Sequence, residues 1–310
     1  MSGQIPEPPR GETILVTGGA GFIGSHLVDV LTDENDVRVL DNLSSGRRER
    51  LPDGVTLFEG DLRDGDTVGR ATADVDLIFH EAALVSVEES VAAPVESHSV
   101  NVDGTLALLE RARAEDARVV LASSAAIYGH PEYVPIDETH PTAPSSPYGL
   151  EKVTIDEYAR LYHELYGLET VVLRYFNVYG PRQVGGDYSA VISVFLEQAR
   201  SGDPITVDGD GTQTRDFVHV SDVVQANLLA ATTDAVGESF NVGTGSSVTI
   251  RELAETIRTV VGSDAEIVHG DPRPGDIDRS RAAIEKARTE LGYEPTVPLE
   301  AGLETLAHNG

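Results

Sequence analysis

The chain has 310 residues, 40% of them hydrophobic, which is enough for a substantial core in one large or two unequal domains. Its 52 acidic and 23 basic residues give a formal net charge of −29, which argues against nucleic acid or an anionic membrane as a partner. The absence of cysteine excludes disulfides, thiolate metal sites and a cysteine nucleophile.

Residues 1–12 are polar and rich in proline, and no later run is apolar enough to span a membrane. We therefore expect a flexible leader on a cytoplasmic protein. Lysine occurs only at Lys152 and Lys286, while arginine supplies every other basic residue. This acidic, lysine-poor composition is typical of salt-loving organisms, where salt screens the repulsion, and an acidic protein of a mesophile is the less favoured alternative.

The first predicted element is a buried strand over Thr13–Thr17, followed at once by the glycine-rich run Gly18–Gly24 and a helical pattern. Gly19, Gly21 and Gly24 have the spacing of the dinucleotide fingerprint. Glycines at these positions allow a tight turn and bring the backbone close to a pyrophosphate at the helix N-terminus. The sequence therefore predicts a dinucleotide site here.

A second strand, Val37–Leu40, ends at Asp41. An acid at this point would bind the adenosine ribose hydroxyls and repel a 2′-phosphate, which favours NAD over NADP. Arg47 and Arg48 follow closely, and they leave NADP open as the alternative.

Further strands over Val55–Phe58, Val75–Phe79 and Val119–Ala122 alternate with helical patterns. This rhythm predicts a doubly wound parallel sheet, in which ligands bind at the carboxyl ends of the strands. His80 follows one of these strands directly. We expect it to be a packed residue beside the cofactor rather than a general base or a metal ligand.

Ser123 and Ser124 follow the strand Val119–Ala122, and a helix is predicted to begin at about Tyr148. Tyr148 and Lys152 lie one turn apart on that helix, so they share a face. An ammonium held at this distance favours the phenolate of tyrosine and makes it a base near neutral pH. Because lysine is so rare in this chain, we interpret the pair, together with a strand-end serine, as a catalytic triad.

From Thr13 onward the chain resembles the extended short-chain dehydrogenase/reductase family, and within it the nucleotide-sugar 4-epimerases of the UDP-glucose 4-epimerase kind. Many motifs in the same order carry this resemblance. They are Thr17–Gly24, Asp41-Asn42, Gly60–Leu62, His80–Ala83, Asn101–Thr105, Ser123–Gly129, Pro147–Lys152, Leu173–Pro181, Asp216–Val220 and Asn241–Gly243.

The resemblance implies an α/β fold with a Rossmann-like doubly wound parallel sheet and a smaller C-terminal α/β substrate domain. We expect the NAD-binding domain at residues 13–172 and the UDP-sugar domain at residues 173–310, with some exchange of segments. In this family, the equivalents of the helical patterns Val95–Ala114 and Tyr148–Tyr166 form a four-helix dimer interface. A homodimer is therefore expected, although an intramolecular core explains an apolar helix face equally well.

The resemblance also implies the reaction. Tyr148 would take the proton of the sugar 4-hydroxyl while hydride passes to the nicotinamide, and Ser124 would hydrogen-bond the same oxygen. Lys152 would bind the nicotinamide ribose and lower the pKa of Tyr148. The 4-keto sugar would then turn over and take the hydride back on its other face, so that tightly bound NAD is restored in each cycle.

The family's binding residues map onto named positions. Asn177, Arg215, Arg273 and Asp276 match its contacts to the substrate diphosphate and ribose, and Ser280 stands where epimerases confined to glucose and galactose tend to have tyrosine. The small Ser280 predicts that UDP-GlcNAc and UDP-GalNAc are accepted with UDP-Glc and UDP-Gal, and Tyr188–Ile192 resembles the same branch. The implied NAD contacts are Gly18, Gly21, Phe22, Ile23, Gly24, Asp41, Asn42, Asp61, Leu62, Ala82, Ala83, Asn101, Ser123, Tyr148, Lys152 and Tyr175.

Ala125 and Ala126 depart from the related dehydratases and decarboxylating enzymes, which place acids in this loop. Without those acids, epimerisation is the favoured chemistry. Two alternatives stay open. One is a UDP-glucuronate 4-epimerase or another sugar-nucleotide oxidoreductase, and the other is a cofactor-binding regulator without catalysis, which would generally lose the tyrosine or the lysine.

Overall fold

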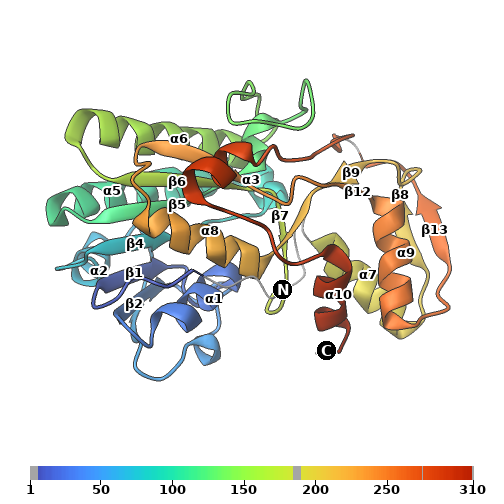
Figure 1. Ribbon diagram of the computed structural model, residues 1–310, viewed down its shortest axis with the longest axis horizontal. Helices are drawn as coiled ribbons and strands as arrows, with labels where there is room; N and C mark the ends of the chain where they lie inside the picture. Colours follow the sequence, from blue (N-terminus) through green and yellow to red (C-terminus); the bar gives the residue numbers. More distant parts are fainter. Residues whose placement is uncertain (1–5, 184–189, 274, 309–310) are drawn as a thin grey trace.

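The computed structural model describes residues 6–183, 190–273 and 275–308, which form a large lobe and a smaller one (Figure 1). The large lobe contains a seven-stranded parallel sheet in the order β11-β6-β5-β4-β1-β2-β3, so the predicted Rossmann-like α/β class is confirmed. Its strands are β1 (Thr13–Thr17), β2 (Asp36–Asp41), β3 (Thr56–Glu59), β4 (Leu77–His80), β5 (Arg118–Ser124), β6 (Thr170–Tyr175) and β11 (Glu238–Val242).

The sheet is buried on both faces because successive apolar residues of each strand point to opposite sides. On β1, Ile14 and Val16 join one core, while Leu15 joins the other. Helices α1 (Phe22–Leu31) and α8 (Val220–Thr232) cover the first face. The second face is covered by α2 (Gly65–Ala71), α5 (Gly104–Glu115) and α6 (Pro147–Tyr166).

The helical pattern predicted over Val95–Ala114 is present, but it is not one regular α-helix. After α3 (Val87–Ala92), the chain forms α4 (Pro94–His98), a π-helical stretch at Ser99–Asp103, and then α5. Such stretches insert a residue into the helical ladder and are frequent at functional sites. Here the stretch contains Asn101, whose side chain reaches back to the loop after β4.

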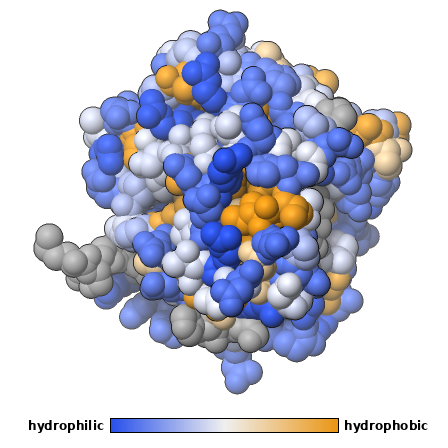
Figure 2. All heavy atoms as spheres, turned by 90° about the vertical axis from the view of Figure 1, so that its right-hand side faces the viewer, coloured by the Kyte–Doolittle hydropathy of each residue, from blue (hydrophilic) through white to orange (hydrophobic). Residues whose placement is uncertain are grey.

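The smaller lobe has its own core, formed by α7 (Ala190–Ser201), α9 (Ile250–Val261), α10 (Leu299–His308) and a short sheet. Its outer face is mostly hydrophilic, as expected for so acidic a chain, with a compact hydrophobic patch near the centre of the view and smaller ones toward its edges (Figure 2). The remaining strand pairs are β7 (Asn177–Tyr179) with β10 (Phe217–His219), β8 (Ile205–Asp208) with β13 (Ile267–Gly270), and β9 (Thr214–Arg215) with β12 (Val248–Thr249).

The chain passes between the two lobes more than once, so no single residue divides them. The expected boundary after residue 172 falls inside β6, and the chain returns to the large lobe with α8 and β11. Within the expected leader, residues 1–5 lie outside the described residues, while Pro9, Gly11 and Glu12 make hydrogen bonds to Glu34 or Asn35. Among the helices that the structure describes, none is long and apolar enough to cross a bilayer.

Candidate active site

A cavity of about 300 Å³ opens at the carboxyl ends of β4, β5 and β6, where the two lobes meet. This is the edge at which a doubly wound sheet binds its ligands. Many of the residues predicted for the site come together here. They are Phe22, Ile23, Ala83, Ser123, Ser124, Tyr148, Lys152, Tyr175, Asn177, Arg215 and Ser280.

The glycines of the glycine-rich loop are packed so closely that they leave no room for a side chain. Gly18 has φ +68°, and a Cβ there would lie 2.8 Å from the backbone nitrogen of Ala82. A Cβ on Gly24 would overlap the carbonyl oxygen of Gly18. Gly21 caps α1 without a side-chain hydrogen bond, which leaves the N–H groups of the first turn available to an anion.

Asp41 ends β2 beside this loop, as predicted. Its buried carboxylate accepts hydrogen bonds from the backbone N–H of Ala20 at 3.0 Å and of Leu43 at 2.8 Å. It therefore also holds the glycine-rich loop in place. Arg48, one of the two residues that leave NADP open, is paired with Glu59 at 2.5 Å.

Three other residues predicted to contact NAD contact other parts of the protein in this structure. They are Asn42, Asp61 and Leu62. Asp61 accepts hydrogen bonds from the guanidinium of Arg63, which lowers its pKa to about 2, and it also faces the side-chain amide of Asn42 at 3.4 Å. Leu62 is buried and packs against Gly104. None of the three is among the residues that line the described cavity.

Asn101 also lies apart from the cavity. Its amide oxygen accepts from the N–H of Leu84 at 2.8 Å, and its amide nitrogen donates to the Leu84 carbonyl and to Glu151. Because these bonds use both ends of the side chain, Asn101 fixes the loop after β4 in this structure.

The described residues fit NAD. The glycine-rich loop and the uncapped start of α1 form a cradle for a pyrophosphate, and Asp41 stands where an adenosine ribose would be held. Ser123 lines the cavity, and its buried hydroxyl has no hydrogen-bond partner among the described residues, so it is available to a polar group of a ligand.

The predicted triad meets at one wall of the cavity. Ser146 caps α6 by accepting from the N–H of Gly149 at 3.1 Å, which sets Tyr148 and Lys152 on the first turns of that helix. The Lys152 ammonium donates to the carbonyl of Ala122 at 2.7 Å and lies 5.8 Å from the centroid of the Tyr148 ring. Burial lowers the pKa of Lys152 to about 8.

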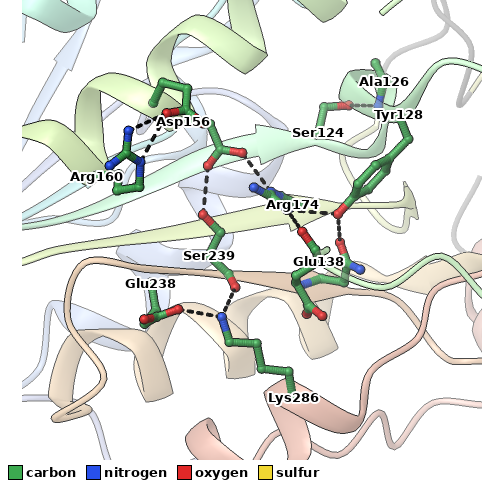
Figure 3. Close-up of polar contacts among 12 residues, drawn as sticks. Ser124, Ala126, Tyr128, Glu138, Asp156, Arg160, Arg174, Glu238, Ser239 and Lys286 are labelled. Carbon is green, nitrogen blue, oxygen red and sulfur yellow. Dashed lines mark hydrogen bonds and ion pairs between the residues drawn. The ribbon is translucent and has the colours of Figure 1, made fainter. Parts of the chain in front are cut away.

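Ser124 stands at the end of β5, opposite the start of α6. Its hydroxyl oxygen accepts from the N–H of Ala126 at 3.2 Å (Figure 3). The hydroxyl proton can therefore be donated toward the cavity. Ala125 and Ala126, which stand where related enzymes place acids, line the cavity with methyl groups.

A buried polar network lies behind this wall (Figure 3). Arg174 of β6 donates to Asp156 of α6 at 2.7 Å and to the hydroxyl of Tyr128 at 3.1 Å. Asp156 also accepts from Ser239 of β11 at 3.0 Å. Asp156 is one turn beyond Lys152, so this network ties the catalytic helix to the sheet.

His80 is packed, as predicted. Its two ring nitrogens lie 2.7 Å from the hydroxyl of Thr17 and 2.8 Å from that of Thr105. Burial lowers its pKa to about 3, so the ring is neutral at pH 7.

Sequence reasoning missed Glu81, which follows β4 directly and lines the cavity. Its carboxylate accepts from the hydroxyl of Tyr175 at 2.7 Å, and that hydroxyl accepts from the amide of Asn227 at 2.8 Å. The available signal was its place in the run His80–Ala83, next to residues already assigned to the cofactor.

The predicted substrate contacts are divided between two neighbouring cavities. Arg215 and Ser280 line the first, and Arg215 forms an ion pair with Asp276. Arg273 and Asp276 line a second cavity of about 860 Å³, and Arg273 pairs with Glu88 at 2.9 Å. Two further positions that the sequence pointed to, Tyr188 and Ser189, lie outside the described residues.

The side chain of Asn177 donates to the backbone carbonyl of Asp216 at 3.1 Å, at the point where β7 meets the smaller lobe. It lines the first cavity, with its amide oxygen open to a donor.

Comparisons with known proteins agree on the family. The model of the NAD dependent epimerase/dehydratase family matches residues 14–243. A UDP-glucose 4-epimerase of Mycolicibacterium smegmatis is 41% identical, covering 93% of this chain and 95% of its own.

Two solved structures are also similar. The UDP-N-acetylglucosamine 4-epimerase of Methanobrevibacter ruminantium, in complex with UDP-N-acetylmuramic acid, is 39% identical with a TM-score of 0.93, over 96% of this chain and 98% of its own. The UDP-glucose 4-epimerase of Thermus thermophilus, in complex with NAD, is 40% identical with a TM-score of 0.88. The match covers 95% of this chain and 97% of that one.

Proposed function

The chain belongs to the NAD-dependent epimerase/dehydratase family, and on this basis we propose that it interconverts the C4 epimers of a UDP-hexose with tightly bound NAD. One observation carries the proposal. Ser124, Tyr148 and Lys152 face one cavity in which no acid replaces Ala125 and Ala126. The site thus has a base for the sugar hydroxyl and lacks the loop acid that elimination of water needs.

NAD, when bound, supplies the acceptor that takes hydride from C4 and returns it. The residues of the chain handle the proton. The Tyr148 phenolate takes it from the 4-hydroxyl and later gives it back, the Ser124 hydroxyl donates to the same oxygen, and Lys152 favours the phenolate by its charge. Arg215 and Asn177 anchor the diphosphate while the sugar turns.

A uronic acid is less suitable as a substrate. Its carboxylate would need a cation near the sugar, and among the described residues that line the first cavity only Lys152 and Arg215 are cationic. Lys152 is assigned to the tyrosine and Arg215 to the diphosphate. We therefore favour a neutral hexose.

The experiment that tests the function is product analysis. Purified protein is incubated in molar KCl with UDP-galactose or with UDP-GlcNAc, without added NADH, because the acidic composition suits high salt. We expect the C4 epimer to form with no net NADH. If neither substrate gives an epimer while NAD is shown to be bound, the assignment to these hexoses is wrong.

Ser280 is expected to admit an N-acetyl group at C2. Its side chain is small, and it lines the cavity on the side of the smaller lobe. In Ser280→Tyr, turnover of UDP-GlcNAc should fall by at least ~100-fold while turnover of UDP-galactose stays within a few-fold, because the phenol fills the space of the acetyl group. Initial rates with the two substrates measure this.

Ser280→Ala is the matched control, since it keeps the small volume and should turn over both substrates. Equal losses on both substrates in Ser280→Tyr would mean that Ser280 does not face C2 of the sugar.

We also infer that two copies of the chain form a homodimer. Several large apolar side chains on neighbouring helices of the large lobe are exposed, among them Val91 of α3, Val95 of α4, and Leu150 and Leu165 of α6. In a chain that is otherwise so acidic, an apolar surface of this kind supports pairing of like subunits.

A further inference from the structure

Glu81 is an acid inside the catalytic cavity that the proposed reaction does not use. It follows β4, and its backbone N–H continues the sheet by donating to the Thr17 carbonyl at 3.1 Å. The side chain therefore starts from a fixed point on the sheet, one residue after the His80–Leu121 pair and so level with Ala122, whose carbonyl accepts from the Lys152 ammonium at 2.7 Å. Glu81 and Lys152 line the same cavity. Burial raises its pKa to about 7, against the opposing effects of Tyr175 and of Lys152.

The hydrogen bonds around Glu81 favour its carboxylate form. With a carboxylate, the Asn227 amide donates to Tyr175, and the Tyr175 hydroxyl donates to Glu81. The amide oxygen of Asn227 is buried and has no partner among the described residues. The second N–H of the Asn227 amide donates to the carbonyl of Val223 at 2.9 Å, which fixes the amide nitrogen toward Tyr175 and leaves the Tyr175 hydroxyl to donate to Glu81.

Lys152 needs a counter-charge because it is 4% exposed and forms no ion pair within 4 Å among the described residues. The carboxylate of Asp156 is paired with Arg174. The carboxylate of Glu151 accepts hydrogen bonds from Ser97 and Asn101, and the His80 ring is neutral. Glu81 has the largest favourable effect on the ammonium. The ionisable groups that face Lys152 are His80 and Glu81 from β4 and its end, Tyr148, Glu151 and Asp156 from α6, and Tyr175 from β6.

We propose that Glu81, held by Tyr175 and Asn227, is a positioning residue whose carboxylate keeps Lys152 protonated at the pH at which the enzyme works. It acts on the reaction through Lys152, which favours the phenolate of Tyr148. This inference rests on the proposed function for the roles of Lys152 and Tyr148. Its central observable, the charge of one lysine, does not depend on which sugar is the substrate.

The rarity of lysine makes the test direct. Protein labelled with ¹³C-lysine gives signals from only Lys152 and Lys286, and Lys286→Arg assigns them. In the NAD-loaded enzyme, Glu81→Gln should lower the midpoint of the Lys152 ammonium titration by on the order of one pH unit, because an opposite charge in the same buried cavity wall is lost. The alkaline limb of the pH dependence of kcat should move down by the same amount.

The matched control is Glu238→Gln, which removes the partner of Lys286, 2.6 Å away, and should shift the Lys286 signal alone. Glu81→Asp should restore most of the Lys152 midpoint, since it returns the charge. If the Glu81→Gln variant does not retain NAD, the Tyr175→Phe variant is measured instead. It should shift the Lys152 midpoint less but in the same direction, because Glu81 loses the hydrogen-bond donor that favours its carboxylate. An unchanged Lys152 midpoint in a variant that retains NAD would overturn the proposal, even if the protein proved inactive on UDP-hexoses.

Discussion

Tyr148→Phe is expected to lower kcat by roughly 10²- to 10⁴-fold, because the ring remains but the group that accepts the proton of the sugar hydroxyl is removed. Tyr148 is 9% exposed and belongs to the wall of the cavity, so the phenyl ring should keep the packing. NAD should therefore stay bound at the wild-type level. Rates with UDP-galactose, together with the cofactor content of the purified variant, measure the two effects separately.

The matched control is Tyr166→Phe, at the end of the same helix, where the side chain is 51% exposed and far along α6 from the triad. It should leave kcat within a few-fold of the wild type. Full activity in Tyr148→Phe would refute the assignment of Tyr148 as the base. Loss of NAD from the variant would instead show that the ring holds the cofactor, and the kinetic result would then say nothing about proton transfer.

The parts of the site that the sequence predicted are those set by local chemistry. The glycine-rich loop follows from its strand, its glycines and its helix, and all of them lie between Thr13 and Leu31. Tyr148 and Lys152 are one helical turn apart, and Ser146 and Pro147 fix where that helix begins. Helical geometry and capping act over this range, so periodicity and spacing are sufficient to find such features.

The features that were missed depend on contacts between distant segments. Glu81, Tyr175 and Asn227 meet because the loop after β4, β6 and α8 are brought together, and no local pattern reports that contact. Arg273, which the resemblance assigns to the substrate diphosphate, pairs in this structure with Glu88, 185 residues away in the chain, and that contact was not predicted. The resemblance assigns a diphosphate contact to Arg273 from its local motif. The pairing of Arg273 with Glu88 depends instead on how its segment packs against α3.

The domain boundary illustrates the same limit. A strand ends where its apolar pattern ends, but whether a later strand returns to the first sheet depends on the edge that remains open. Here β6 presents such an edge, and β11 pairs with it in parallel. Composition and periodicity around residue 172 contain no sign of this pairing, so a boundary placed there from the sequence passes through β6.

The network behind the catalytic wall leads to the second large effect, which is on stability. Arg174→Met is expected to lower the free energy of unfolding by about 3–5 kcal/mol, the usual cost of leaving one partner of a buried ion pair alone. The side chains of Arg174 and Asp156 are only 12% and 5% exposed. The change also removes donors to the hydroxyl of Tyr128 and to the carbonyl of Glu138 (Figure 3). Urea unfolding in molar KCl at pH 7 measures the loss.

The pH dependence of this loss follows from Asp156. Burial raises its pKa, while Arg174 opposes that rise. Without Arg174, the folded-state pKa moves further above the unfolded value. The cost is therefore present when Asp156 is charged and disappears as the pH falls through the raised pKa. We expect the difference in stability between variant and wild type to be smaller in mildly acidic buffer than at pH 7.

Two further variants separate charge from packing. In Arg174→Met/Asp156→Asn the unpaired charge is gone, so the double variant should be more stable than Arg174→Met alone. Arg288→Met breaks an exposed pair with Glu294 and should cost less than about 1 kcal/mol. Equal losses in Arg174→Met and Arg288→Met would contradict a buried, charge-dependent role. A loss that did not change with pH would assign the effect to packing of the arginine stem instead, and α6 would then be held to the sheet mainly by its apolar face.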